Sequence, residues 1–333
     1  MAVQHPTAFV KPMRQQFLFL FLLCFSLSSA AQSFTLVELN CENLFDTRHD
    51  EGKQDAEFLP EAGRHWTPRR YWRKVNNLAQ EIISCGDAMQ LPDVVALCEV
   101  ENDTCLRDLT RRSLLRNAGY EYLMTCSPDE RGLDVALLYQ PASFAPVCYD
   151  ELRVPTLPGM RPTRDVLHVA GRIITGDTLH LFVVHAPSRY GGEVASRPFR
   201  LQVARVLCEA VADLRRHSPD ARIVIAGDFN DYFDSPALQQ LEQHQLLNVG
   251  RQAKGRHGAL ATYRYQGEWR SLDHVFVSPS LHAHVAAALI HDEPFLLEDD
   301  ERYGGVKPRR TYSGFNYRPA FSDHLPLVVR FRF

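Results

Sequence analysis

The stretch Arg222-Ile-Val-Ile-Ala-Gly-Asp-Phe-Asn230 decides how this chain folds. Its apolar run, bounded by turn-forming residues, is typical of a strand buried on both faces of a sheet. Gly227 lets the chain leave the sheet without a side chain in the way. Asp228 and Asn230 are two residues apart, so the period of a strand puts both on one side of the backbone. The stretch predicts either a site for a metal, a water and a phosphate, or only a polar turn that closes the strand.

Other predicted strands also end in polar residues. Residues 34–41 and 93–100 are expected to be strands, and they deliver Asn40 and Glu99 near their ends. A glutamate among Val, Ala, Leu and Cys is costly unless it is paired or bound to a cation, which favours a metal site. Ligand sites of layered α/β proteins collect at strand ends and their loops, so one shared site is expected. Its candidate residues are Asn40, Glu99, His185, Asp228, Asn230, Asp273, Asp323 and His324.

Strands and helices alternate along the 333 residues, which predicts one α/β domain. Hydrophobic residues make up 45% of the chain and charged residues 23%, as in a globular protein. Apolar residues at helical spacing follow Pro68, and a long helix is expected over residues 197–217. The predicted hairpins pair residues 120–126 with 134–139, 166–174 with 178–184, and 261–265 with 271–277.

The N-terminal 31 residues have the pattern of a secretory signal peptide. Lys11 and Arg14 precede an apolar run over residues 17–27, and small residues follow it up to Ala31. The run is too short for a stable membrane span, and Leu22-Leu23 before Cys24 disfavours a lipid anchor. We therefore expect residues 1–31 to be a signal peptide, residues 32–333 to form the domain, and the protein to be exported to the periplasm or secreted.

Positively charged residues that could bind an anionic substrate occur in four segments. The formal net charge is −3, so binding of a polyanion would depend on a local basic patch. Arginines mix with aromatic residues in residues 57–72, follow a Pro/Gly-rich loop at 155–163, and recur in the Gly-rich loop after His185 and in residues 296–317. These residues either contact substrate or are plain surface positions. The candidates for substrate contact are Arg69, Arg164, Arg189 and Arg309.

Six short motifs in this order resemble those of the endonuclease/exonuclease/phosphatase superfamily, and most closely its deoxyribonuclease-like members. Together they extend over residues 34–333, and the ordered set is far more specific than any one motif. They are Asn40-Cys41-Glu42-Asn43-Leu44, Leu97-Cys98-Glu99-Val100, His185-Ala186-Pro187-Ser188, Gly227-Asp228-Phe229-Asn230, Ser271-Leu272-Asp273-His274 and Ser322-Asp323-His324-Leu325-Pro326.

The resemblance implies a fold, a cofactor and a role for each candidate residue. The implied fold is a four-layer α/β sandwich of two packed mixed β-sheets flanked by helices. Glu99 would be the main metal ligand, with Asn40 and Asp323 nearby, and the metal would be Mg²⁺, with Mn²⁺ or Ca²⁺ as alternatives. The implied catalytic residues are Asp228 and Asn230, which orient the water and phosphate, His324 held by Asp273, and His185.

The substrate is less determined than the chemistry. The resemblance and the predicted export favour a phosphodiester substrate in DNA or RNA, acted on by a monomer. One alternative is a lipid-headgroup or inositol-phosphate phosphodiesterase or phosphatase, with Trp66 and Trp72 available to touch a membrane. Another is a non-catalytic member that only binds phosphate, which the intact motifs disfavour.

Overall fold

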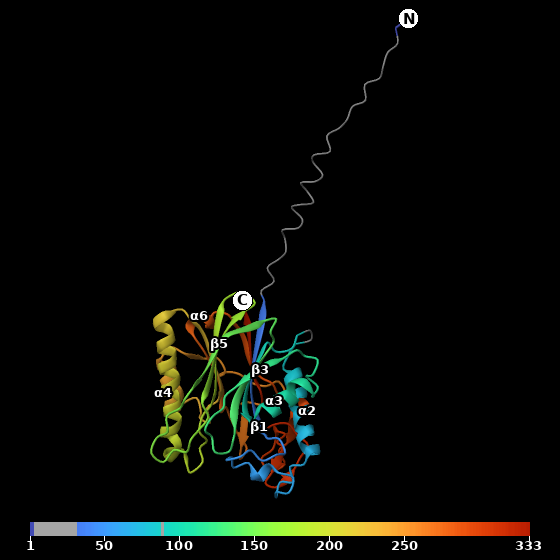
Figure 1. The fold of residues 1–333 in the computed structure, drawn as a ribbon, viewed down its shortest axis with the longest axis vertical. Coiled ribbons are helices and arrows are strands. Elements are labelled where there is room, and N and C mark those ends of the chain that lie inside the picture. The colour runs from blue at the N-terminus through green and yellow to red at the C-terminus, as the bar shows by residue number, and fades with distance from the viewer. Residues whose placement is uncertain (3–31, 88–89) are drawn as a thin grey trace. The chain divides into compact units, whose positions relative to one another are not determined.

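The computed structural model describes residues 1–2, 32–87 and 90–333. The predicted signal peptide therefore lies outside the described residues, apart from Met1 and Ala2. Residues 33–333 form one compact unit in which two six-stranded sheets pack together with helices outside them (Figure 1). This arrangement confirms the four-layer α/β sandwich. No helix of the described residues is long and apolar enough to cross a membrane.

The first sheet has the strand order β13-β18-β1-β2-β4-β3. β1 and β2 are parallel and the other pairs are antiparallel, so the sheet is mixed. Two helices, α2 and α3, cover its outer face (Figure 1). The bounds are β1 Ser33–Leu44, β2 Val94–Val100, β3 Glu121–Met124, β4 Asp134–Tyr139, β13 Val285–Ile290, β18 Leu327–Arg332, α2 Pro68–Ser84 and α3 Asp103–Arg111.

The second sheet has the strand order β5-β6-β7-β8-β12-β9, with β7 and β8 parallel. Helices α4 and α5 pack on its outer face. The bounds are β5 Phe144–Leu152, β6 Val166–Ile173, β7 Thr178–His185, β8 Arg222–Asp228, β9 Leu247–Asn248, β12 Asp273–Val277, α4 Glu193–His217 and α5 Pro236–Gln243. The smaller elements are η1 Ala56–Phe58, β10 Tyr263–Tyr265, β11 Glu268–Arg270, α6 Pro279–His282, η2 Pro294–Leu296, β14 Leu297–Asp299, β15 Val306–Pro308, β16 Tyr312–Ser313 and β17 Asn316–Tyr317.

Alternation along the strands separates the core into layers. In β1, Phe34 and Leu36 face the other sheet, whereas Val37 and Leu39 face α2. In β8, Val224 belongs to the same core between the sheets. The same alternation puts Asn40 of β1, just before the register of that strand shifts, and Asp228 at the end of β8 on the side that faces the space between the sheets.

Two predicted hairpins are confirmed, and the third has a different second arm. β3 pairs with β4 and β6 pairs with β7, as predicted. β10 turns at Gly267 and pairs with β11, not with residues 271–277. Those residues contain β12, which lies between β8 and β9 in the second sheet. All five residues of β12 are buried, so the strand is stable only with neighbours on both edges, whereas β11 is largely exposed.

Candidate active site

The ends of four strands meet where the two sheets face each other. In the second sheet, Asp228 at the end of β8 lies opposite His185 of the parallel strand β7 and opposite Asp273 of the antiparallel strand β12. Asn40 approaches from β1 of the first sheet, and its Nδ2 donates a hydrogen bond to Asp228 Oδ2 over 3.0 Å. The register of one sheet and the packing of the two sheets together build this cluster.

The backbone at the cluster takes conformations that most residues avoid. Seven non-glycine residues of the described chain have positive φ, and four of them are Glu42, Asn43, Glu99 and Asn230. Each such residue costs roughly 1–3 kcal/mol, and this kind of strain concentrates at functional sites. At Asn230, with φ of 50°, the turn lets its backbone N–H donate to Asp228 Oδ1 over 2.7 Å and its side chain donate to the carbonyl of Ala186 over 3.1 Å.

Asp228 is a buried carboxyl group adapted to exchange a proton near neutral pH. Burial and the nearby charge of Asp273 raise the pKa of Asp228 to about 7, although the charge of His324 and the hydrogen bond from Asn230 act in the other direction. A general base works best when its pKa is close to the working pH. Asp228 can therefore align a water molecule and accept a proton from it.

His324 and Asp273 form a buried pair. His324 Nδ1 lies 2.8 and 3.0 Å from the two carboxylate oxygens of Asp273, and Thr262 Oγ1 donates a further hydrogen bond to Asp273 Oδ2. Burial alone would lower the pKa of His324, but the charge and hydrogen bond of Asp273 outweigh it and the pKa is raised well above its usual value. His324 is therefore a fixed cation that can stabilise negative charge or donate a proton.

His185, unlike His324, has a lowered pKa. Burial and the positive charges of Arg164 and Arg131 lower its pKa well below the usual value, so the imidazole is neutral. Its Nε2 lies 3.7 Å from Asp228 Oδ2 and 3.9 Å from Glu99 Oε1. The site thus contains one neutral and one charged imidazole, set by their different neighbours.

Glu99 presents an oxygen that fits a hard cation. The backbone N–H of Asn43 donates to its Oε2 over 2.8 Å, while Oε1 has, among the described residues, only the 3.9 Å contact to His185. Asn40 adds an amide oxygen, which accepts from the N–H of Glu42 over 2.9 Å. Carboxylate and amide oxygens are the ligands that Mg²⁺ prefers, so these residues suit the predicted metal.

A second group of side chains also has a spacing that would allow a cation. Ligand atoms of Asp228, Asp273 and His324 lie within 4.8 Å of one another. However, the raised pKa of His324 favours the imidazolium form, in which both ring nitrogens carry protons and neither has a lone pair for a metal. These three residues therefore fit proton transfer better than metal binding, and Glu99 is the better ligand.

Asp323 is tied to Arg310 and, through it, to Glu42, neither of which was among the candidate site residues. Arg310 Nη2 lies 2.7 Å from Asp323 Oδ2, and Arg310 Nε lies 3.4 Å from Glu42 Oε1. Burial and the charge of Asp323 raise the pKa of Glu42 to about 7, and Lys74 lies 3.7 Å from its Oε2. Glu42 lies two residues after Asn40 in one of the six motifs, and this position was the signal in the sequence that could have placed it at the site. For Arg310 the sequence offered no signal except its place in a basic segment.

The four candidate arginines have different surroundings. Arg69 is exposed on the first turn of α2. Arg164 is buried, where it pairs with Asp129 and donates to the carbonyl of Ala186, directly after His185. Arg189 lies over the ring of Tyr232, and Arg309 donates to the carbonyl of Phe295. Arg164 is thus tied to the backbone next to His185, and substrate contact by all four arginines stays a prediction.

Beyond the geometry, the sequence matches the profile of the Endonuclease/Exonuclease/phosphatase family over residues 35–332, nearly the whole described domain. The chain belongs to the endonuclease/exonuclease/phosphatase family. A search of curated proteins finds no match. Members of this family are generally hydrolases that act on phosphoester bonds and typically use divalent metals.

Solved structures of the same fold cover most of the chain. An endonuclease/exonuclease/phosphatase family protein from Bacteroides thetaiotaomicron has a TM-score of 0.59 and 17% identity, covering 91% of this chain and 98% of its own. A mannosyl-6-phosphatase from the same species has a TM-score of 0.57 and 17% identity, and the match covers 89% of this chain and 98% of that one. D. rerio TDP2 complexed with a single-strand DNA product has a TM-score of 0.54 and 15% identity, and the match covers 91% of this chain and 100% of that one. At these identities the likeness shows the fold alone.

Proposed function

We propose that this family member is an exported, divalent-metal-dependent phosphodiesterase that acts on nucleic acid. The observation that carries the proposal is the buried carboxyl of Asp228, with its pKa near 7, held between Asn40 and the His324–Asp273 pair. Hydrolysis of a phosphodiester needs an aligned water, a neutralised phosphate and a protonated leaving oxygen. Asp228, Asn40 and the His324–Asp273 pair, which could meet these needs, lie within one cluster. Export rests on the signal peptide predicted for residues 1–31.

In the proposed reaction the residues of the chain divide the work. Asp228 aligns the attacking water and accepts its proton, while the amide of Asn230 fixes the carboxylate through hydrogen bonds. His324, kept cationic by Asp273, stabilises the charge that develops on the phosphate or protonates the leaving oxygen. Glu99 and Asn40 would hold the divalent cation, which when bound neutralises phosphate charge and orients the substrate.

The comparisons offer support for two substrate classes. One structural neighbour is complexed with single-strand DNA, which agrees with the nuclease-like motif that begins at His185. Another is named as a mannosyl-6-phosphatase, so a phosphomonoester on a small molecule is the second candidate. A lipid-directed activity loses one of its supports, because Trp66 is 1% exposed and packs against Tyr312 inside the domain.

The test is a hydrolysis assay of the purified protein with Mg²⁺ and with EDTA. The substrates are plasmid DNA, RNA, sphingomyelin, mannose 6-phosphate and bis(p-nitrophenyl) phosphate. We expect Mg²⁺-dependent cleavage of DNA or RNA that weakens as salt is added. His324→Ala should lower turnover by about 10²–10⁴-fold, the contribution of one acid–base group. The control is His217→Ala, an exposed residue at the end of α4. Hydrolysis confined to the lipid or to the sugar phosphate would refute the nucleic-acid assignment.

A further inference from the structure

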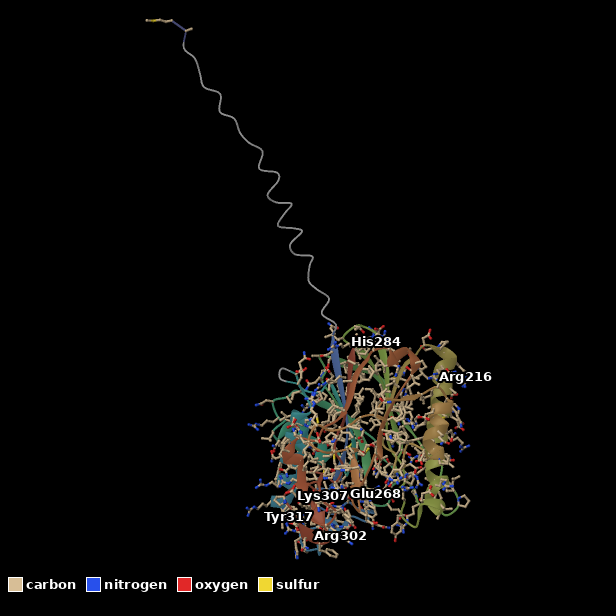
Figure 2. The ribbon with its side chains drawn as sticks, turned by 180° about the vertical axis from the view of Figure 1, so that it is seen from behind. Arg216, Glu268, His284, Arg302, Lys307 and Tyr317 are labelled. Carbon is tan, nitrogen blue, oxygen red and sulfur yellow. The ribbon has the colours of Figure 1, made fainter. Side chains whose placement is uncertain are left out.

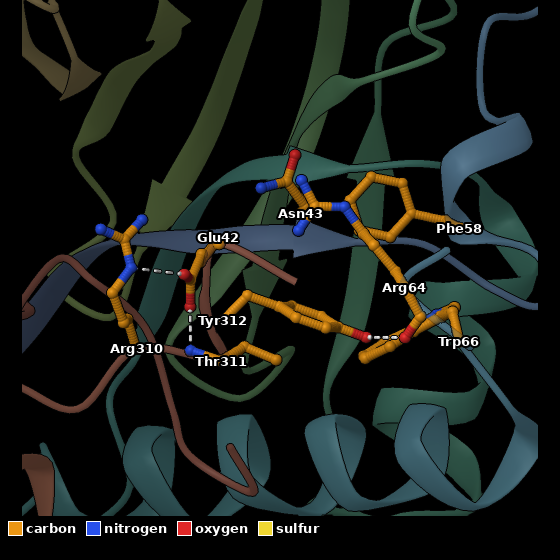
Figure 3. Close-up of a pocket in the computed structure, with 9 residues that line it drawn as sticks. Glu42, Asn43, Phe58, Arg64, Trp66, Arg310, Thr311 and Tyr312 are labelled. Atoms are coloured by element: carbon orange, nitrogen blue, oxygen red, sulfur yellow. Dashed lines mark hydrogen bonds and ion pairs between the residues drawn. The ribbon is translucent and has the colours of Figure 1, made fainter. Parts of the chain in front are cut away.

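A small cavity lies next to the candidate active site. Its volume is about 210 Å³, and it is shown in Figure 3. Two lining residues connect it to the site: the N–H of Asn43 holds Glu99, and Arg310 pairs with Asp323. A group attached to a phosphate at the site would therefore have this cavity as a neighbour. The lining residues are Glu42, Asn43, Phe58, Arg64, Trp66, Arg310, Thr311, Tyr312 and Gly314.

Arg64 is a cavity residue with two unused donor nitrogens that aromatic rings hold in place, and within the described residues Arg310 Nη1 and Asn43 Nδ2 are also without a protein partner. Its guanidinium carbon lies 5.2 Å from the ring centre of Phe58 and 5.0 Å from that of Tyr312, so aromatic rings hold the group in place. Nε donates to Glu57 over 2.8 Å. Within the described part of the chain, neither terminal nitrogen of Arg64 donates to another residue. Figure 3 shows the guanidinium beside Asn43 and Phe58.

The carboxylate and side-chain amide oxygens that line the cavity, by contrast, already face donors of the protein. Glu42 Oε2 accepts from the N–H of Thr311 over 2.6 Å, and Glu42 Oε1 faces Arg310. Asn43 Oδ1 accepts from Arg131, and the hydroxyl of Tyr312 donates to the carbonyl of Arg64. A ligand in this cavity must therefore bring acceptors of its own, since donors are what the protein leaves free.

The size and the lining of the cavity limit the possible ligands further. Its volume is below the roughly 300–1,000 Å³ of sites for drug-sized molecules, so it has room for one small group. The rings of Phe58, Trp66 and Tyr312 are 4%, 1% and 7% exposed, so they support Arg64 instead of offering open faces for stacking. A planar guanidinium with a free edge is the group that proteins use for bidentate recognition of phosphate or carboxylate.

We propose that this cavity binds a second anionic group of the same substrate, adjacent to the phosphate that is hydrolysed, and that Arg64 is the residue that selects for it. The inference rests on the proposed function, because it takes the reacting phosphate to lie beside Asp228 and Glu99. The second anion has two possible sources of the same chemistry. One is the neighbouring phosphate of an oligonucleotide, and the other is a second phosphate on a small phosphorylated molecule.

The experiment compares matched substrates in the full-length protein. The first pair consists of thymidine trinucleotides that have one phosphodiester to be cleaved. The flanking linkage is a phosphodiester in one member of the pair and a neutral methylphosphonate in the other, and it is tested on the 5′ side and on the 3′ side. Inositol bisphosphate and inositol monophosphate form the second pair. The variants are Arg64→Gln, Arg64→Lys and the control Arg216→Gln, an exposed residue on α4 whose partner is Asp213 (Figure 2). Melting curves verify that each variant is folded.

We expect Arg64→Gln to lower kcat/KM about 10- to 100-fold for the substrate with a charged flank and to leave the neutral-flank substrate unchanged, as loss of a charge-assisted hydrogen bond predicts. Arg64→Lys should recover part of the loss. The substrate pair that responds to Arg64→Gln, either the trinucleotides or the inositol phosphates, identifies the source of the second anion. Equal effects on both members of each pair, or no preference of the wild type for the charged flank, would overturn the inference and leave the proposed function intact. If the wild type hydrolyses none of these phosphoesters, both fail.

Discussion

Replacement of Gly227 by alanine tests how closely the central strands must approach. A Cβ atom at this position would lie 1.8 Å from the carbonyl oxygen of Val184 in the adjacent strand β7. Real Cβ atoms essentially never come within 3.0 Å of such an atom, so β7 and β8 would have to separate by more than 1 Å. Overpacking costs about 1–3 kcal/mol, and a side chain at φ of +154° adds roughly 1–3 kcal/mol. We expect a loss of about 2–6 kcal/mol in the free energy of unfolding.

Gly176→Ala is the matched control. Gly176 also has positive φ, +86°, but no atom lies within 4 Å of the added Cβ. That variant should lose only the backbone contribution, about 1–2 kcal/mol. Guanidinium unfolding followed by circular dichroism measures both changes. If Gly227→Ala were no less stable than Gly176→Ala, the clash would not matter and the reasoning about the strand spacing would be wrong.

Three further predictions concern single carboxyl groups. Asp273→Asn removes the charge that keeps His324 protonated, so turnover on bis(p-nitrophenyl) phosphate should fall about 10²–10⁴-fold while the melting temperature changes little; unchanged turnover would exclude the pair from catalysis. Glu81 is fully buried, and burial raises its pKa to about 8 despite the opposing charge of Lys74. Because the folded-state pKa is above the unfolded one, the folded state binds this proton more tightly, and the stabilisation present below about pH 4.5 is lost as the pH rises to about 8. The free energy of unfolding of Glu81→Gln, measured in urea, should therefore rise relative to that of the wild type by up to about 5 kcal/mol as the pH increases across that range. If the free energies of the two proteins changed with pH in parallel, this prediction would be wrong. Glu99→Gln should abolish the rise in melting temperature that Mg²⁺ produces in the wild type; an undiminished rise would place the cation elsewhere.

Local patterns were sufficient to predict the strands that carry the site. The apolar run before Gly227 predicted a buried strand, and β8 covers Arg222–Asp228. The same reasoning placed Asn40 and Glu99 near the ends of β1 and β2. These predictions succeed because burial on both faces and the two-residue period are properties of a short segment and leave a direct record in the sequence.

Predictions that depended on partners distant in sequence were less reliable. The hairpin at Gly267 had an incorrect second arm, because both β11 and β12 follow the turn and only sheet packing decides which strand returns. The roles of Arg310 and Lys74 around Glu42 were also not predicted, since nothing near Glu42 in the sequence indicates the charges that surround it.

The sequence by itself determined that polar residues close a series of buried strands and that their order matches one family. Only the tertiary structure decided what each of them touches. Asn40 and Asp228 are 188 residues apart and meet because two sheets pack face to face. The same packing gives the Asp228 carboxyl its raised pKa, through burial and through the charge of Asp273 on the next strand. Such a pKa depends on the solvent that packing removes and the charges it brings near, and neither is a property of the stretch from Arg222 to Asn230 alone.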